Sequence, residues 1–492
     1  MTRSATPGAA FGRFEWILLA LGALAALWLH WHFRISGFGE QDAGRLASDA
    51  INWHFEGSID MTKVDYRLHT SPLYIHSMKL ALDHGLSVRS IPVFMNGLSV
   101  LASSACMVGL YLLFRQLSTP AIATAATLVY SFTPCFWLGS VYGMPTLPAL
   151  TLLVFAALAF GKAADQPRLR SLGFAGYLAL SALLIALAFS IKADMALSSG
   201  ALLLALVARG RLRPVLLACI VLIVGLGTLF TTAYAHHVAL PVVEAAPKDT
   251  HAVGGFLESW SARFPFKWSL LIDPKNNAPI THAAGSLLFA LCVLALFQGA
   301  LGNKRRRWLT FGAAAWGLPP LLFWGLKPGN SARHNLPAFA PLVFLAVLML
   351  FQLVDYRARR AWPLIVMLLL VGQMDLTGNN SVTPRVDVLL TTEQVQNASS
   401  SLHTRAREFM SSPNPKKAII ESEYLQSYSE FEAWAAAKTP TLRARHNSQK
   451  TIGDGPERET RLLLIGSARV AKTQAERLRS QGFDVFSLQF SL

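Results

Sequence analysis

The chain has 492 residues, of which 53% are hydrophobic, and it carries a formal net charge of +16. Several apolar runs reach the length of about 20 residues that a helix needs to cross a bilayer, which excludes an ordinary soluble protein. The basic residues recur in alternate connections between these runs, as the positive-inside rule requires. We therefore attribute the charge surplus to orientation in the membrane and expect no nucleic-acid partner.

The N-terminal residues 1–16 are basic and precede an apolar stretch over residues 17–33 that lacks a small-residue cleavage site. We interpret this stretch as an uncleaved signal anchor with a cytoplasmic N-terminus. Roughly ten further apolar segments follow, so the sequence predicts a polytopic α-helical membrane protein with about 11 transmembrane helices. An odd number of spans places the C-terminus outside. We expect the inner membrane of a bacterium, with the C-terminal part in the periplasm.

The first long hydrophilic stretch contains two acids, Glu40 and Asp42, after a Ser-Gly-Phe-Gly turn. From Asp42 onward apolar residues recur at helical spacing, which predicts an amphipathic helix on the membrane surface. A second external helix is expected to begin with Ser71 as N-cap and to end near Gly85. Acids at a helix start also complement the helix macrodipole, and this structural interpretation stays open.

The sequence becomes more polar after residue 376, which divides the chain into a transmembrane module (1–376) and a C-terminal domain (377–492). Alternating helical and strand patterns in this tail predict a small α/β domain. We expect it to be structural or to shape access to a site at the membrane. The helices are expected over residues 391–410, 427–438 and 470–480, and the strands over residues 417–420, 462–465 and 483–490.

Three motifs, each weak by itself, are specific through their order along the chain. They are Glu40-Gln41-Asp42 in the first external loop, Tyr66 to Tyr74 ending in Ser-Pro-Leu-Tyr, and Ser331-Ala-Arg-His-Asn-Leu-Pro337. On this topology they resemble the GT-C superfamily of polytopic glycosyltransferases, in particular the protein O-mannosyltransferases and the aminoarabinose transferase acting on lipid A. The resemblance covers residues 17–376. It implies an enzyme that transfers a sugar from a polyprenyl-phosphate-linked donor, in the bilayer, to an acceptor at the outer membrane face.

The resemblance also implies that an external carboxylate assists the attacking hydroxyl group. Asp42 is the first candidate for this catalytic base and Glu40 is the second. Gln41 separates the two acids, whereas the family has an adjacent acidic pair. Metal binding therefore stays open, with a divalent metal as the candidate cofactor and its site unknown. A further acid of the family is missing from the second external turn, residues 142–148.

Cations beside the donor phosphate would stabilise the departing group. We select Arg333 first, because the guanidinium fork suits phosphate oxygens, and then Lys192, His69 and Arg67. Three of them have a structural alternative, which for His69 is a hydrogen-bonded loop residue. Arg333 could anchor a span at the interface, and Lys192 could form an ion pair with Asp194 at a helix turn.

Tyr66, Tyr74 and His334 are the candidates for lining the substrate site, where the tyrosine rings could stack on the sugar or the prenyl chain. The alternatives are an aromatic belt for the tyrosines and a hydrogen-bonded loop residue for His334. The sequence specifies neither the sugar nor whether the acceptor is a glycan, a lipid or a protein.

A second class of function stays in view. The chain could be a non-catalytic transporter of lipid-linked sugars, or a GT-C pseudoenzyme that recruits a partner through its C-terminal domain. A transporter should place charged groups at mid-membrane along a path. Here the spans carry charges almost only near their ends, which favours chemistry at the interface.

Overall fold

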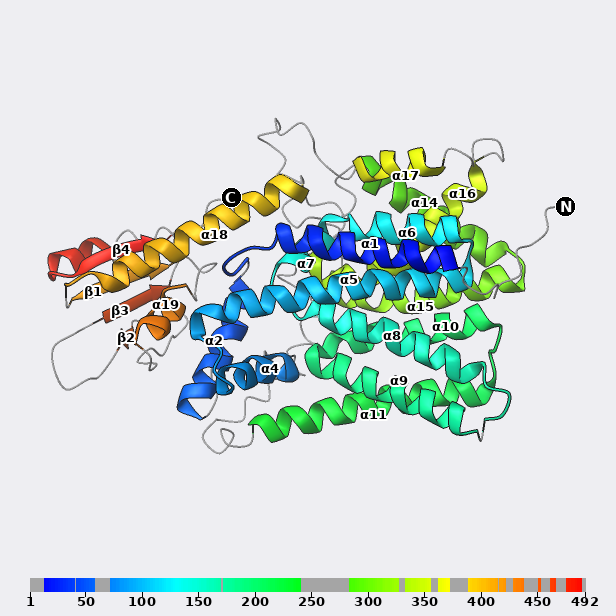
Figure 1. Ribbon diagram of the computed structural model, residues 1–492, viewed down its shortest axis with the longest axis horizontal. Coiled ribbons are helices and arrows are strands. Elements are labelled where there is room, and N and C mark those ends of the chain that lie inside the picture. Colours follow the sequence, from blue (N-terminus) through cyan, green and yellow to red (C-terminus); the bar gives the residue numbers. More distant parts are fainter. Residues whose placement is uncertain are drawn as a thin grey trace.

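The computed structural model shows a bundle of helices that continues into external helices and a four-stranded sheet (Figure 1). The long helices of the bundle run roughly along the longest axis of the molecule, and the sheet lies beyond one of their ends. The structure describes residues 13–39, 41–57, 71–169, 171–239, 283–326, 332–354, 362–371, 388–414, 416–421, 428–437, 450–452, 461–465 and 475–488.

The bundle is predominantly apolar, and its core is filled by large side chains such as Trp316, Phe114 and Phe344. Among the described residues, five helices are long and apolar enough to cross a membrane, or six if one bent pair counts as a span. The chain is therefore an integral membrane protein. The bundle helices are α1 (Arg13–His32), α5 (Ile91–Leu117), α6 (Pro120–Ser131), α7 (Pro134–Val141), α8 (Thr146–Ala164), α9 (Leu172–Ile191), α10 (Gly200–Arg209), α11 (Pro214–Ala239), α14 (Ala283–Leu301), α15 (Lys304–Leu326), α16 (Leu336–Leu353) and α17 (Trp362–Val371).

One expected span, residues 121–138, is divided into α6 and α7, which meet at a bend of 67°. Pro134 stands at the first position of α7. Proline disfavours helical backbone in the residue before it and cannot donate a backbone hydrogen bond, so α6 ends and a new helix begins there. Two short 3₁₀ helices also interrupt the bundle, η2 (Ala193–Ser198) between α9 and α10 and η6 (Ala332–Asn335) before α16.

Three external elements follow the first span: α2 (Gln41–Glu56), α4 (Pro72–Asp83) and the short 3₁₀ helix η1 (Val88–Ser90). The predicted helix from Asp42 is confirmed, and its apolar face is buried against α4. Ser71 is the N-cap of α4, as expected, although its side chain makes no capping hydrogen bond. The helix ends just before Gly85, whose φ of 93° lies in the left-handed region that glycine adopts without strain.

The polar tail contains the elements that the pattern predicted, namely α18 (Val388–Ser411), α19 (Tyr428–Ala437), β1 (Lys417–Glu421), β3 (Arg461–Ile465) and β4 (Asp484–Leu488). One short strand, β2 (Lys450–Ile452), was not predicted. The sheet has the order β2-β3-β1-β4. Strand β1 pairs in parallel with both β3 and β4, whereas β2 is antiparallel to β3.

Side chains of β1 alternate between two apolar clusters, as the two-residue period of a strand requires. Ala418 and Ile420 pack beside Leu478, which lies in a helical turn over residues 475–480. Ile419 joins a second cluster that contains residues of α18 and α19 and also Ala47 of α2. The described part of the tail therefore shares an apolar core with the first external loop.

Candidate functional site

Asp42 lies in the first turn of α2, where its side chain is 34% exposed. Its carboxylate forms an ion pair with Arg45 of the next turn, with the Arg45 Nη1 atom 3.5 Å from Oδ1. Anionic groups are favoured at this end of a helix because the backbone amide groups there lack partners. The Asp42 carboxylate is therefore accessible to solvent, and the start of α2 sets its position. Glu40, the second candidate base, lies outside the described residues.

The chain segment that leads to this acid, residues 35–39, is held by the bundle; we name it the approach loop. The Asn96 side chain on α5 is 1% exposed and donates hydrogen bonds to the carbonyl groups of Ile35 and Gly37, at 2.7 and 3.1 Å. A buried amide with two backbone acceptors fixes the loop against α5, because an unmade hydrogen bond there would be costly.

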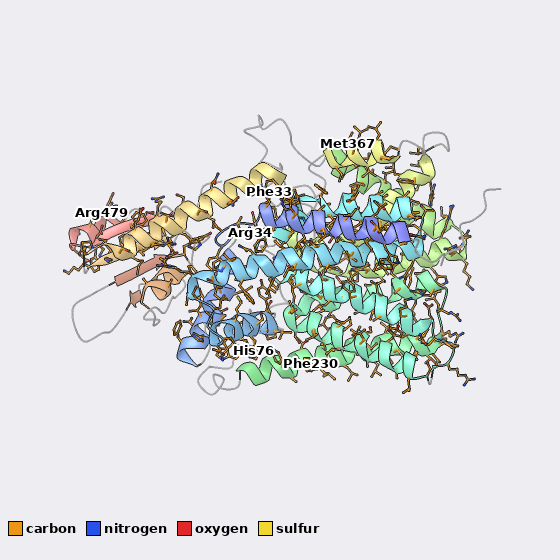
Figure 2. All side chains as sticks on the ribbon, viewed as in Figure 1. Phe33, Arg34, His76, Phe230, Met367 and Arg479 are labelled. Carbon is orange, nitrogen blue, oxygen red and sulfur yellow. The ribbon has the colours of Figure 1, made fainter. Side chains whose placement is uncertain are left out.

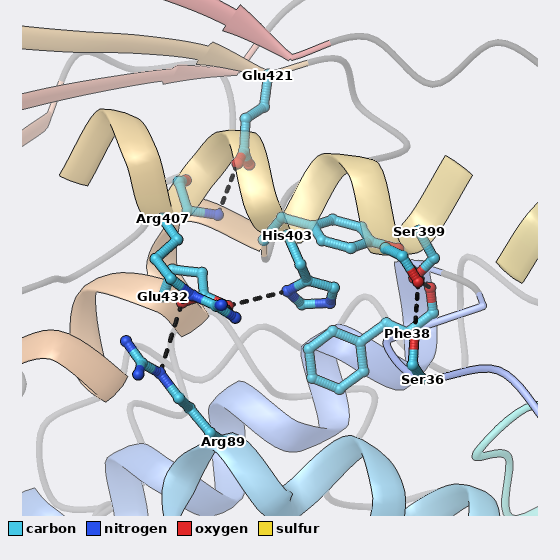
Figure 3. Close-up of polar contacts among 11 residues, drawn as sticks. Ser36, Phe38, Arg89, Ser399, His403, Arg407, Glu421 and Glu432 are labelled. Carbon is cyan, nitrogen blue, oxygen red and sulfur yellow. Dashed lines mark hydrogen bonds and ion pairs between the residues drawn. The ribbon is translucent and has the colours of Figure 1, made fainter. Parts of the chain in front are cut away.

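The tail holds the approach loop from the opposite side (Figure 3). The buried carbonyl oxygen of Phe38 accepts a hydrogen bond from the Ser399 hydroxyl group at 2.9 Å and another from the Tyr428 hydroxyl group. The Ser36 and Ser400 hydroxyl oxygens lie 2.6 Å apart. Two helices of the tail, α18 and α19, thus bind the backbone just before the candidate base.

The approach loop contains two described glycines, and side chains of the tail and the bundle pack directly against their backbone. A Cβ atom at Gly37 would collide with the His403 ring and the Ser399 hydroxyl group, and one at Gly39 would collide with Ile35 and the Tyr142 ring. Glycine is therefore required at both positions by space and not by backbone angle.

Behind the loop, Glu432 of α19 is 1% exposed and is surrounded by two arginines and a histidine. Its carboxylate lies 3.3 Å from His403 Nδ1, 3.4 Å from Arg407 Nε and 3.8 Å from Arg89 Nε (Figure 3). Burial alone would raise the pKa of Glu432, but hydrogen bonds from His403 and Arg407 lower it below its ordinary value. Because Arg89 belongs to η1, this network ties the tail to the bundle.

A second group of polar residues forms where α9 ends; we name it the Lys192 cluster, consisting of Lys192, Asp194, Trp324 and His334. The Lys192 ammonium group is 2.9 Å from Asp194 Oδ2 and 5.8 Å from the centre of the Trp324 ring. The Trp324 ring stacks on His334 with centroids 4.4 Å apart. The ion pair that was the alternative for Lys192 is therefore present, and it lies beside His334.

Two residues near this cluster have buried polar atoms without a hydrogen-bond partner among the described residues. These atoms are Oδ1 of Asp194 and both side-chain polar atoms of Asn335, which is fully buried at the start of α16. Buried polar groups in folded proteins are nearly always paired, so such atoms point to a further polar group.

A third polar group joins α2, α4 and α11. The His76 ring of α4 lies tilted against the Trp53 ring, with centroids 4.8 Å apart, and hydrogen-bonds to the Tyr234 hydroxyl group. Asp83 lies 2.7 Å from His54 Nδ1. Burial is the main reason why the pKa of His76 is lowered from its ordinary value. Figure 2 shows His76 on α4 facing α11.

All three groups lie at one end of the bundle. Ile191, the residue before Lys192, packs against the apolar cluster of α2 and α4, and Tyr142 packs against that cluster and against Gly39. The cations that close α5, α8 and α10 instead line one cavity at the other end. The candidate base and the Lys192 cluster are thus on the same side of the bundle.

The side chains of several predicted site residues lie outside the described part of the structure, so their placement stays a prediction. Tyr66, Arg67 and His69 lie outside the described residues. Arg333 is in η6 next to His334, but only its backbone is described. Tyr74 is 2% exposed in the cluster between α2 and α5, so its ring packs in the interior of the external region and not on an open surface.

Metal binding was left open by the sequence. In the part of the chain that the structure describes, no three His, Cys, Asp or Glu side chains converge as a metal site requires. Asp42 itself is engaged by Arg45. The described residues do not fit a protein-bound divalent metal, and we derive no step through one.

Sequence reasoning missed several residues of this region, among them Trp324, Asn96, Ser399 and Tyr428. Asn96 gave a usable signal, because an amide side chain inside an apolar span needs a partner. Ser399 and Tyr428 carry no local signal, since their partner Phe38 is far away in the sequence; Tyr428 and Phe38 are separated by 390 positions. Trp324 lies in an apolar helix, where an aromatic residue is ordinary.

The fold and the site define an integral membrane protein with an acid-bearing external helix and a lysine–aspartate ion pair at the same end of its bundle. Residues 83–236 match the family described as dolichyl-phosphate-mannose-protein mannosyltransferase. No curated protein sequence matches the chain.

Solved structures with the same fold include two of ArnT from Cupriavidus metallidurans. The chain is 13% identical to ArnT bound to undecaprenyl phosphate, with a TM-score of 0.56, and the match covers 87% of this chain and 86% of that one. For ArnT in the apo state the TM-score is 0.54, at 13% identity over 87% and 85%. The apo oligosaccharyltransferase of Archaeoglobus fulgidus gives 0.50, at 13% identity over 88% and 65%. The resemblance to GT-C membrane glycosyltransferases is therefore confirmed at the level of the fold.

Proposed function

We propose that the protein is a membrane glycosyltransferase that moves a sugar from a polyprenyl-phosphate donor to a hydroxyl group at the outer face of the membrane. The observation that carries this proposal is the fold shared with ArnT bound to undecaprenyl phosphate over 87% of the chain. The acid of α2 and the Lys192 cluster lie at the same bundle end, which supports it.

The chemistry assigns a role to each group. Transfer develops positive charge on the sugar and negative charge on the departing phosphate, as in glycoside cleavage. Asp42 is exposed enough to reach an acceptor and would take the proton of the attacking hydroxyl group. Replacing it with asparagine keeps the shape and removes the base.

The Lys192 cluster would hold the phosphate. Lys192 is paired with Asp194, so we propose that Arg333, one residue before His334, supplies the further positive charge. Trp324 is buried and stacks on His334, so it would fix the position of that side chain beside the donor.

The distribution of charge disfavours the alternative of a transporter. The spans α9, α11 and α16 contain no Asp, Glu, Lys or Arg along their length. A translocation path for a charged lipid headgroup would expose polar groups at mid-membrane.

We further propose about 11 spans, a cytoplasmic N-terminus and a periplasmic small α/β domain in residues 377–492. Labelling of single introduced cysteines from outside would test this topology. Label at Glu408 and at Arg213 from the same side would contradict it.

The test of function is transfer by the purified protein in liposomes that contain polyprenyl-phosphate sugars with a labelled sugar. Several donors and acceptors should be offered, with and without a chelator. We expect Asp42→Asn to reduce transfer at least hundredfold, the upper range of general base catalysis being about 10⁴-fold. Glu408→Gln, which removes an exposed carboxylate of α18, is the matched control. Full activity after replacement of both Asp42 and Glu40 would refute the mechanism.

A further inference from the structure

A cavity of about 900 Å³ lies at the bundle end that is away from the candidate site. It lies between α5, α8, α9 and α10 and also touches Trp16 of α1 and Arg305 of α15. Ligand pockets in proteins typically enclose roughly 300 to 1,000 Å³, so the space is large enough for a molecule of substantial size.

The walls and the rim of this cavity differ in chemistry. The walls are apolar and include Leu112, Phe155, Leu158 and Leu184, contributed by α5, α8 and α9. Tyr177 and Leu180 on α9 also line it and are exposed, so the cavity opens sideways between helices. An apolar slot with a lateral opening fits hydrocarbon chains.

Five cations surround the same space. Two of them are occupied, because Arg115 lies 2.8 Å from Glu15 and Arg209 pairs with Asp165. The other three are Lys162, Arg211 and Arg305; they are exposed and have no ion-pair partner among the described residues. The rim therefore presents an excess of positive charge directly beside the apolar walls.

We propose that this cavity binds one anionic phospholipid of the leaflet that faces the basic end of the bundle. Its phosphate would lie among Lys162, Arg211 and Arg305, and its acyl chains would lie along the apolar walls. Basic pockets between membrane helices suit anionic headgroups, because their charges are complementary at a depth where screening is weak. Trp16 and Tyr177 have the amphipathic rings that settle at this level of a bilayer.

The proposal is independent of the candidate active site, because none of its residues belongs to that site. It can be tested by native mass spectrometry of the full chain in detergent with added dioleoyl phosphatidylglycerol or dioleoyl phosphatidylcholine. We expect one retained phosphatidylglycerol and no retained phosphatidylcholine at equal concentration. Retention of the two lipids to the same extent would overturn the proposal.

Variants separate the cavity from the general charge of this end. The triple variant Lys162→Gln, Arg211→Gln, Arg305→Gln should bind phosphatidylglycerol on the order of a hundredfold more weakly, since each cation near a lipid surface contributes roughly fivefold. The control removes as much charge from three exposed cations outside the cavity and should bind as the wild type does. Its substitutions are Arg168→Gln, Arg213→Gln and Arg306→Gln. Equal loss in both triple variants would refute a specific site.

Two further measurements distinguish a lipid from a free phosphate. Leu158→Trp fills the apolar part without changing a charge, and we expect it to weaken phosphatidylglycerol binding at least tenfold. Excess glycerol 3-phosphate should fail to displace the bound lipid, because it lacks the chains that contact the walls. Complete displacement, or full binding by a folded Leu158→Trp protein with an unchanged melting temperature, would show that the site does not hold a lipid.

Discussion

Removing the two hydroxyl groups that bind the Phe38 carbonyl oxygen should release the approach loop and thereby the candidate base. Tyr428→Phe alone leaves Ser399 as a donor, so the cost is that of one hydrogen bond, about 1 kcal/mol. Ser399→Ala alone is similar, because Tyr428 still donates. With both changes the buried Phe38 carbonyl oxygen loses both of these hydroxyl donors. Leaving it without a hydrogen bond costs roughly 1 to 3 kcal/mol in addition to the bonds themselves.

The two substitutions should therefore act far more than additively. Each single variant should keep transfer within about fivefold of the wild type, while a total near 3 kcal/mol in the double variant corresponds to about a hundredfold change in the population of the held loop. The assay is the maximal rate of sugar transfer in liposomes, measured together with the KM for the donor. We expect the maximal rate to fall and the KM to change little, since the Lys192 cluster is untouched.

The matched control is Ser480→Ala, an exposed serine of the tail whose hydroxyl group bonds within its own helical turn. Limited proteolysis of the double variant reports whether the tail is still folded. If a folded double variant transferred sugar at the wild-type rate, the tail would not position the loop. Inactivity of Asp42→Asn in the same assay would then still support the proposed base, so the two ideas fail separately.

Three further changes test other parts of the structure. Burial raises the pKa of Glu421 from 4.5 to about 7. The folded tail therefore loses stability as the pH rises from 4.5 to 7, because the unfolded chain gives up the proton first. The loss reaches about 3 kcal/mol above pH 7. Glu421→Gln should raise the melting temperature of the tail at pH 8 and change it little at pH 4.5, and an equal gain at both values would contradict this. Lys192→Gln should raise the donor KM roughly tenfold, because one charge-assisted contact is lost; an unchanged KM would remove this residue from the donor site. Gly37→Ala should lower the maximal rate at least tenfold, since the added methyl group meets the His403 ring; thermal melting would report any accompanying loss of fold.

Much of the architecture follows from local patterns in the sequence. The helix at Asp42 was predictable because its apolar residues repeat at helical spacing. Strand β1 was predictable because the short apolar run 418–420 follows the turn-forming residues 412–415. The short strand β2 has only three residues, too few for a pattern. The break between α6 and α7 had a signal in Pro134, but the apolar run across it favoured one continuous helix.

The arrangement of the candidate site could not be predicted in the same way, because its contacts connect distant parts of the chain. Each residue of the Lys192 cluster, taken alone, is an ordinary residue near the end of a span. Their significance comes from the stacking and the ion pair that place them together. Sequence spacing has no information about such a contact when intervening spans can pack in several orders.

The contacts of the approach loop explain why a polar tail would matter to chemistry at the membrane. A catalytic carboxylate must be held within roughly 0.5 Å of its working position. A loop between two helices does not fix a side chain that precisely without further contacts. Asn96 fixes one side of the loop from the bundle, and Ser399 with Tyr428 fixes the other side from the tail. The acid therefore depends on two parts of the protein at once. Movement of the tail relative to α5 would move the backbone before Asp42, so under the proposed function we expect the tail to control transfer without contacting either substrate.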